Sequence, residues 1–118
     1  MPNPHELALV VKALKDGLTN CVYWDRKSVN RVRNNRDLRG FTPKFIRSEL
    51  IRLVKDGKVS VKQVHETREN WVIHYDYYYK SILPNEEFTN GIFVEMRLVD
   101  PDEPTFEFPV VALVNAHP

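Results

Sequence analysis

Side chains able to do acid–base chemistry share one face of a strand predicted over residues 71–80. Alternate residues of a strand point the same way, about 6–7 Å apart. The polar face carries His74, Asp76, Tyr78 and Lys80. Metal-free cleavage of an RNA phosphodiester needs such a mixture, because one group accepts the 2′-hydroxyl proton, another protonates the leaving oxygen, and cations stabilise the developing charge. The alternative is an ordinary solvated strand face.

A second predicted strand, over residues 92–99, extends this face. Apolar side chains of the two strands meet when paired residue numbers sum to 175. The same register sets Lys80 opposite Glu95, where the pair is either part of a site or an ordinary cross-strand ion pair. It also sets Tyr78 opposite Arg97. A slip by one residue would place charges on the core face, so the pattern predicts this register.

The tyrosines of the first strand divide between its faces. Tyr75, Tyr77 and Tyr79 share the apolar face, and we interpret them as core residues rather than as a platform for base stacking. Tyr78 points outward, where a phenol ring is able to stack on an RNA base.

Familiar catalytic and cofactor motifs are missing from the sequence. It has no phosphate-binding glycine loop, no CxxC pair, no HExxH and no nucleophile-serine motif. His65, His74 and His117 fall in or beside predicted strands, but their spacing fixes no two ligands on one element. We therefore predict neither a metal nor a cofactor.

Basic residues are concentrated in the first half of the chain. Residues 1–63 hold 14 Lys and Arg against 6 Asp and Glu, whereas residues 64–118 hold 3 against 10. A basic stretch of this density suits a polyanion such as RNA. The candidate nucleic-acid-binding residues are Arg26, Lys27, Arg31, Arg33, Arg36, Arg39, Lys44 and Arg47. The alternatives are a solvated helical face and a surface that docks onto the acidic half of a second copy.

Length and composition predict one globular domain over residues 1–118, with 42% hydrophobic and 11% aromatic residues. No apolar run reaches the roughly 18 residues of a membrane-spanning helix, and the first residues lack the pattern of a secretion signal. The single cysteine, Cys21, cannot form an internal disulfide, which fits a reducing compartment. We expect a cytoplasmic protein without a membrane anchor.

Two helices are clearly marked before residue 60. Asn3 caps the first, which stops at Gly17, and Thr42 caps the second, which stops at Gly57. Between them, the basic stretch 25–39 predicts a helix that packs weakly, because few of its residues are apolar.

From residue 58 the apolar period changes from 3.6 to 2 residues, which indicates strands. They are predicted over 58–66, 71–80, 92–99 and 110–116, with a loop over 83–91. The last strand is apolar on both sides, as expected of a central strand. Residues 18–24 form a short apolar segment that is either extended or simply packed. The fold class is therefore predicted as α+β, with two to three N-terminal helices packed on one face of a C-terminal antiparallel sheet of about four strands.

This order of elements resembles the RelE-like messenger-RNA interferase toxins, and within them the motility quorum-sensing regulator toxins. The resemblance is one of layout. It is carried by "VKALKDG", a basic connector, "FTPKFIRSELIRLVKDG", "KVSVKQV", "NWVIHYDYYYK", "GIFVEMRLV" and "VVALVNAH". It implies a metal-independent endoribonuclease that a cognate antitoxin neutralises.

The resemblance also bears on individual residues. Lys62 falls where that branch keeps an active-site lysine. The branch has a glutamine where this chain has Val72, a tyrosine where it has Phe93, and a terminal basic residue where it has His117. We hypothesise that other polar residues of the sheet replace the lost groups. The candidate catalytic residues are then Lys62, His74, Tyr78, Lys80, Arg97 and His117.

Three hypotheses follow. The first is an RNA-acting toxin-like protein, an endoribonuclease of a toxin–antitoxin system with RNA and an antitoxin-like protein as partners. The second is a noncatalytic module of the same fold that binds nucleic acid or protein. The third is a protein that self-associates through its oppositely charged halves.

Overall fold

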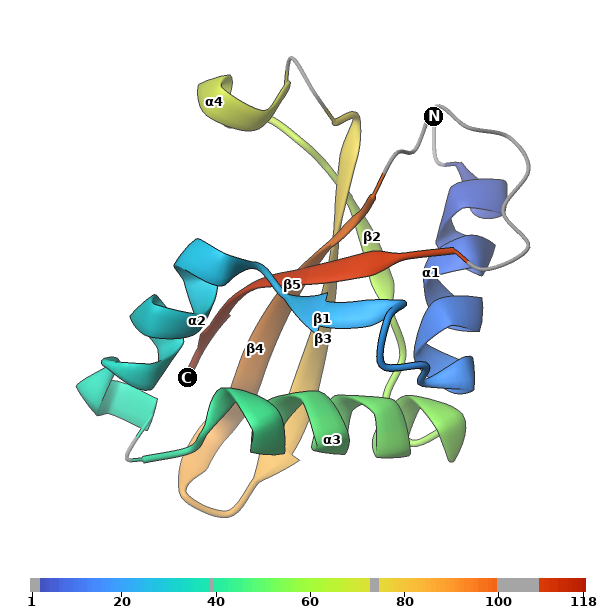
Figure 1. Ribbon diagram of the computed structural model, residues 1–118. Helices are drawn as coiled ribbons and strands as arrows, with labels where there is room; N and C mark the ends of the chain where they lie inside the picture. Colours follow the sequence, from blue (N-terminus) through green and yellow to red (C-terminus); the bar gives the residue numbers. More distant parts are fainter. Residues whose placement is uncertain (1–2, 39, 73–74, 100–108) are drawn as a thin grey trace.

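A computed structural model of the protein describes residues 3–38, 40–72, 75–99 and 109–118 (Figure 1). Its elements are α1 (Pro4–Asp16), β1 (Val22–Trp24), α2 (Arg26–Arg33), α3 (Pro43–Lys55), β2 (Lys62–His65), α4 (Glu69–Val72), β3 (Tyr77–Asn85), β4 (Phe88–Leu98) and β5 (Val111–His117). Two candidate site residues, Arg39 and His74, lie outside the described residues. In the described part of the chain, no helix is long and apolar enough to cross a membrane.

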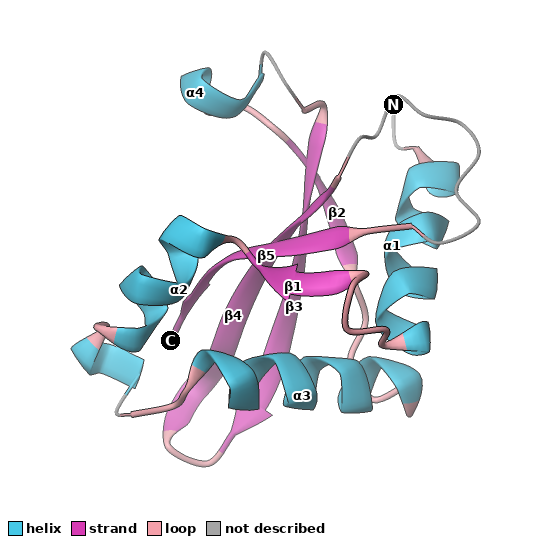
Figure 2. Ribbon diagram, viewed as in Figure 1, coloured by secondary structure: helices cyan, strands magenta, loops and turns pink. Residues whose placement is uncertain are grey.

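The strands form one sheet in the order β1-β5-β4-β3-β2. β1 runs parallel to β5, and the other neighbours are antiparallel. The predicted α+β class is confirmed, with helices in the N-terminal part and a mostly antiparallel sheet in the C-terminal part (Figure 2). The strand beyond the expected four is β1, which lies within the apolar segment 18–24.

The two main helices begin where their caps predict. The Asn3 side chain accepts a hydrogen bond from the Glu6 backbone N–H, and the Thr42 hydroxyl accepts one from the Phe45 N–H at 3.1 Å. At Gly17 the left-handed backbone ends α1 and returns an N–H to the Ala13 carbonyl. Local sequence is therefore sufficient to place α1 and α3.

One face of the sheet packs against α1 and α3 to form the core. Alternate residues of the strands point toward these helices, as the period of 2 requires. The buried core includes Val10 and Leu14 from α1, Ile46 and Leu50 from α3, and Tyr79, Val94, Met96 and Leu113 from the sheet. The helix α2 packs against β5 instead, well apart from α1 (Figure 2).

The predicted register between β3 and β4 is confirmed from Tyr79–Met96 to Leu83–Ile92, where every pair sums to 175. Lys80 accordingly lies opposite Glu95. The expected loop over 83–91 is wrong, however, because β3 continues to Asn85 and β4 starts at Phe88 in a tight hairpin with an irregular register.

The expected strand over 71–80 is also wrong at residues 71, 72, 75 and 76, while residues 73 and 74 lie outside the described residues. Residues 69–72 form the short helix α4, and β3 starts only at Tyr77. Part of the cause is nonlocal, because the Glu66 carboxylate after β2 pairs with Arg97 of β4 while it accepts hydrogen bonds from the backbone N–H groups of Thr67 and Arg68. This turn removes the neighbour that a longer strand would need. The strand predicted over 58–66 is also shorter than expected. β2 covers only Lys62–His65, because the chain first makes a turn around Gly57 after α3.

Both faces of β5 were expected to be buried. Its first three residues, Val111–Leu113, are buried on both faces, whereas Val114, Asn115 and His117 are only half-buried. The side chains of Asn115 and His117 therefore belong to the face that α1 and α3 leave uncovered.

Candidate functional site

The face of the sheet opposite α1 and α3, called here the open face, carries most of the candidate catalytic residues. The strand register places on it the side chains of Lys62, Tyr78, Lys80, Phe93, Glu95, Arg97, Asn115 and His117. Five of the six candidates are in this set, and the sixth, His74, lies outside the described residues. Residues from four strands thus meet on one surface, although they span more than 50 positions of the chain.

Two lysines face each other across β2 and β3. Lys62 pairs with Lys80, and residues directly opposite in an antiparallel pair have Cβ atoms about 5 Å apart. Like charges at this spacing repel, so an anion between them would be stabilising. Together with Lys58 they line a hollow of about 370 Å³ at this edge of the open face.

The ordinary cross-strand ion pair between Lys80 and Glu95 does not form. The Glu95 carboxylate instead accepts from Arg68 at 3.2 Å, and the Lys80 ammonium lies 5.7 Å from the centre of the Phe93 ring. Within the described residues Lys80 forms no ion pair, so its charge remains available on the surface.

The imidazole of His117 stacks on the same aromatic ring. The His117 and Phe93 ring centres lie 5.3 Å apart with their planes at 11°. One nitrogen, Nδ1, lies 3.2 Å from the backbone oxygen of Pro118. When Nδ1 carries the proton and donates it to this oxygen, Nε2 is the proton-accepting atom. An imidazole and an ammonium group therefore border one half-buried aromatic ring.

A buried ion-pair network lies at the other end of the open face. Arg97 is 2% exposed and Glu66 is 1% exposed, and their side chains form an ion pair. Arg68 binds the same carboxylate through its Nε at 3.1 Å. Burial alone would raise the pKa of Glu66, but the hydrogen bonds from Arg68 and Arg97 outweigh it and lower this pKa to about 2. The hydrogen bond with Glu66 in turn raises the pKa of Arg68.

Tyr78 packs against this network. Its ring lies 4.7 Å from the Arg68 guanidinium and 5.5 Å from that of Arg97. The second guanidinium also lies 5.2 Å from the Tyr75 ring. Tyr78 is thus half-buried between two cations, and Arg97 is held from several sides.

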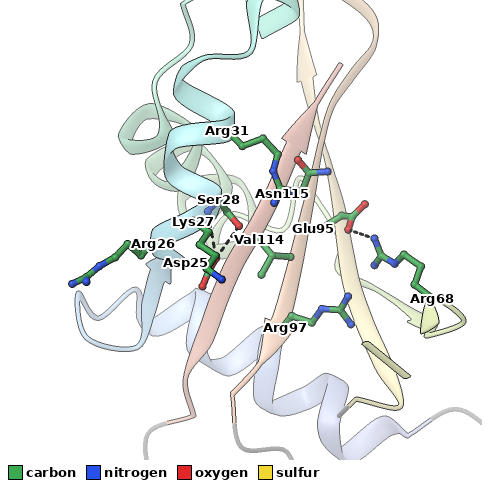
Figure 3. A pocket seen from close by; sticks show the side chains of 10 residues that line it. All are labelled: Asp25, Arg26, Lys27, Ser28, Arg31, Arg68, Glu95, Arg97, Val114 and Asn115. Atoms are coloured by element: carbon green, nitrogen blue, oxygen red, sulfur yellow. Dashed lines mark hydrogen bonds and ion pairs between the residues drawn. The ribbon is translucent and has the colours of Figure 1, made fainter. Parts of the chain in front are cut away.

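The basic segment 26–47 divides between two parts of the molecule. Arg26, Lys27 and Arg31 line a cavity shared with Arg68 and Arg97 beside the open face (Figure 3). Arg33, Arg36 and Lys44 are exposed elsewhere, on α2, the following turn and α3. Arg47 is structural, because its Nε donates to the Val22 carbonyl at 2.7 Å and ties α3 to β1.

Arg68 and Glu66 belong to the network at the open face, although the sequence did not single them out as candidate site residues. The sequence does make Arg68 conspicuous, because Arg68, Lys80 and Arg97 are the only Lys or Arg residues among residues 64–118. All three meet at the open face, where α2 adds the cations of the basic half. Basic residues from the two halves of the sequence therefore lie close together in the folded protein.

Among residues 3–38, 40–72, 75–99 and 109–118, no group of three or more His, Cys, Asp or Glu side chains is placed to hold a metal ion. No protein family, curated protein or solved structure matches this chain.

Proposed function

We propose that this protein binds single-stranded RNA across the open face of its sheet. The observation that carries the proposal is that Lys80 and His117 border the half-buried ring of Phe93, while Lys62 lies directly across from Lys80. Proteins read unpaired RNA with aromatic rings that stack on bases and with cations that contact phosphates. The open face offers both kinds of group in neighbouring strands.

The binding path runs across the strands. One row of paired residues leads from Lys62 to Lys80, Glu95 and Asn115, and α2 lies beyond it with Lys27 and Arg31. Neighbouring strands are about 4.8 Å apart, so this row spans the length of two to three nucleotides. Arg97 and Tyr78 act as positioning residues in this proposal, because Arg97 is buried in the ion pair with Glu66 and the half-buried Tyr78 ring packs against it.

Salt-dependent RNA binding tests the proposal. A short unstructured RNA with 2′-O-methyl groups serves as the probe, since it resists cleavage by its own sugar oxygens. The variant Lys62→Gln with Lys80→Gln should weaken binding and flatten the slope of log affinity against log salt by about 1.4, or about 0.7 for each lost phosphate contact.

The matched control is Lys15→Gln with Lys55→Gln, which removes the same charge from exposed positions of α1 and α3. The control should keep the slope of the unmodified protein. Absence of RNA binding, or an equal loss in both variants, overturns the proposal.

A second candidate function is metal-independent cleavage of the bound RNA, as the resemblance to messenger-RNA interferase toxins implies. It is favoured by His117 and Lys80 bordering one ring. In the reaction the 2′-oxygen bonds to phosphorus and the bond to the 5′-oxygen breaks. His117 Nε2 accepts the 2′-hydroxyl proton, a lysine ammonium protonates the 5′-oxygen, and the lysines stabilise the negative charge. The products are a 2′,3′-cyclic phosphate and a 5′-hydroxyl.

Cleavage is tested with unmodified RNA in the presence of a metal chelator. His117→Ala should abolish the products even at concentrations that saturate the variant with the 2′-O-methyl RNA, because Lys62, Lys80 and Phe93 remain to bind it. Binding without products removes cleavage and leaves RNA binding in place.

The partners follow from the same proposal. An antitoxin that neutralises this chain would cover the open face, and its contacting surface would be acidic. Self-association through the charged halves is a separate proposal, which predicts an oligomer that dissociates as salt is raised.

A further inference from the structure

A cavity of about 440 Å³ lies between α2 and the open face (Figure 3). Small-ligand sites are typically about 300–1,000 Å³, so it has room for a group of nucleotide size. Its cations come from α2, from the segment after β2 and from β4. They are Arg26, Lys27, Arg31, Arg68 and Arg97.

The carboxylates of this cavity already have partners. Asp25 caps α2 by accepting from the Ser28 N–H and hydroxyl. Glu95 pairs with Arg68 at 3.2 Å, and the adjoining Glu66 pairs with Arg68 and Arg97. Five cations therefore stand against three carboxylates, and the cavity retains a positive balance.

Two exposed cations of α2 complete this arrangement. Lys27 and Arg31 are four residues apart, which puts them on one helix face. Figure 3 shows Arg31 reaching from α2 toward Asn115, whereas Arg26 extends away from the other side chains. In the described part of the chain, neither Lys27 nor Arg31 forms an ion pair. They line the same cavity as Arg97, which the buried network holds in place, so part of the site is preorganised.

We infer that this cavity binds a terminal phosphomonoester, as found at a phosphorylated RNA end or on a free nucleoside monophosphate. The RNA form of the inference rests on the proposed function. A phosphomonoester carries about −1.5 to −2 charges at neutral pH, more than an internal phosphodiester, and guanidinium groups bind its oxygens in pairs. The cavity also continues the row of the open face, since Asn115 lies opposite Glu95 and Glu95 opposite Lys80. A strand lying on the open face would thus deliver its end to the cavity.

Competition binding tests this inference with three 2′-O-methyl RNAs of one sequence. One carries a 5′-phosphate, one a 3′-phosphate, and one has no terminal phosphate. At least one phosphorylated RNA should bind about tenfold more tightly than the unphosphorylated one, the size expected of an added charge-assisted hydrogen bond. Lys27→Gln with Arg31→Gln should bring this ratio close to one.

The matched control is Arg33→Gln with Arg36→Gln, which removes the same charge from exposed positions outside the cavity. The control should weaken all three RNAs alike and keep their ratio. Equal affinity for the three RNAs in the unmodified protein overturns this inference alone, as does an equal loss of the ratio in both variants. If none of the RNAs binds, the proposed function fails and the RNA form of the inference fails with it.

Adenosine monophosphate distinguishes the two sources of the phosphomonoester. If the RNA end is the ligand, the mononucleotide should compete far more weakly than the phosphorylated RNA, because it makes no contact with the open face. Competition of equal strength, lost in the Lys27→Gln and Arg31→Gln variant, would instead support a mononucleotide site and overturn the assignment to an RNA end.

Discussion

Glu66 and Arg97 form an ion pair that is almost entirely shielded from water, with 1% and 2% of their surfaces exposed. The pair joins the segment after β2 to β4, and the ring of Tyr78 packs over the guanidinium. It therefore fixes one end of the open face.

The first prediction concerns this pair. Glu66→Gln leaves the Arg97 charge buried without its counter-charge, which costs about 3–5 kcal/mol when one member of a buried pair is removed. Urea unfolding near neutral pH should show a loss of this size. The exposed Glu87→Gln in the hairpin turn is the control and should change the free energy of unfolding by less than about 0.5 kcal/mol.

The second prediction is the pH dependence of the same contribution. The pKa of Glu66 falls from 4.5 to about 2 on folding, so its stabilisation is complete above about pH 4.5 and is lost as the pH falls toward 2. The difference in unfolding free energy between the unmodified protein and Glu66→Gln should shrink across this window. A difference that stays constant down to pH 2 would contradict the assignment.

The third prediction concerns the tie between α1 and the sheet. The Tyr79 hydroxyl donates to Glu6 at 2.7 Å and accepts from the Gln63 side chain at 3.0 Å. Burial and, beyond it, the neighbouring Glu6 raise the pKa of Tyr79, so the hydroxyl keeps its proton and remains a donor. Tyr79→Phe should destabilise by about 1–3 kcal/mol because it removes a charge-assisted hydrogen bond to Glu6 and the hydrogen bond from Gln63. Tyr23→Phe, at an exposed position, should have little effect in the same thermal unfolding experiment.

The fourth prediction concerns the β3–β4 hairpin. Gly91 has φ of 78°, and a Cβ there would stand 2.5 Å from the Leu83 carbonyl oxygen. Gly91→Ala should therefore cost more than the roughly 1 kcal/mol of a left-handed backbone alone. Gly57→Ala shares the positive φ but meets no atom within 4 Å, so it measures the backbone cost by itself. Equal losses at the two positions in denaturant unfolding would refute the steric argument.

The fifth prediction follows from the proposed toxin-like action on RNA. Induced expression in a bacterial host should arrest growth, and Lys62→Ala with His117→Ala should restore it. Lys15→Ala on α1 should leave the arrest unchanged. Comparable amounts of the three proteins, checked by immunoblot, exclude loss of expression as the reason. Unimpaired growth with the unmodified protein would count against toxin-like action.

The sequence alone was sufficient for the features that short-range physics determines. The caps at Asn3 and Thr42 and the left-handed residue at Gly17 place α1 and α3, because each acts within one helical turn. The register of β3 and β4 was equally predictable, since a slip by one residue would turn charged side chains into the core.

Only the tertiary structure decided where β3 begins and how the cations are distributed. The alternating pattern before Tyr77 indicates a strand, but the Glu66 carboxylate turns the chain through hydrogen bonds and an ion pair with Arg97, which is 31 positions away. Arg47 likewise donates a hydrogen bond to a backbone carbonyl of β1, while Arg31 lines the cavity beside the open face. Contacts between distant residues depend on the packing of whole elements, which no local pattern of residues encodes.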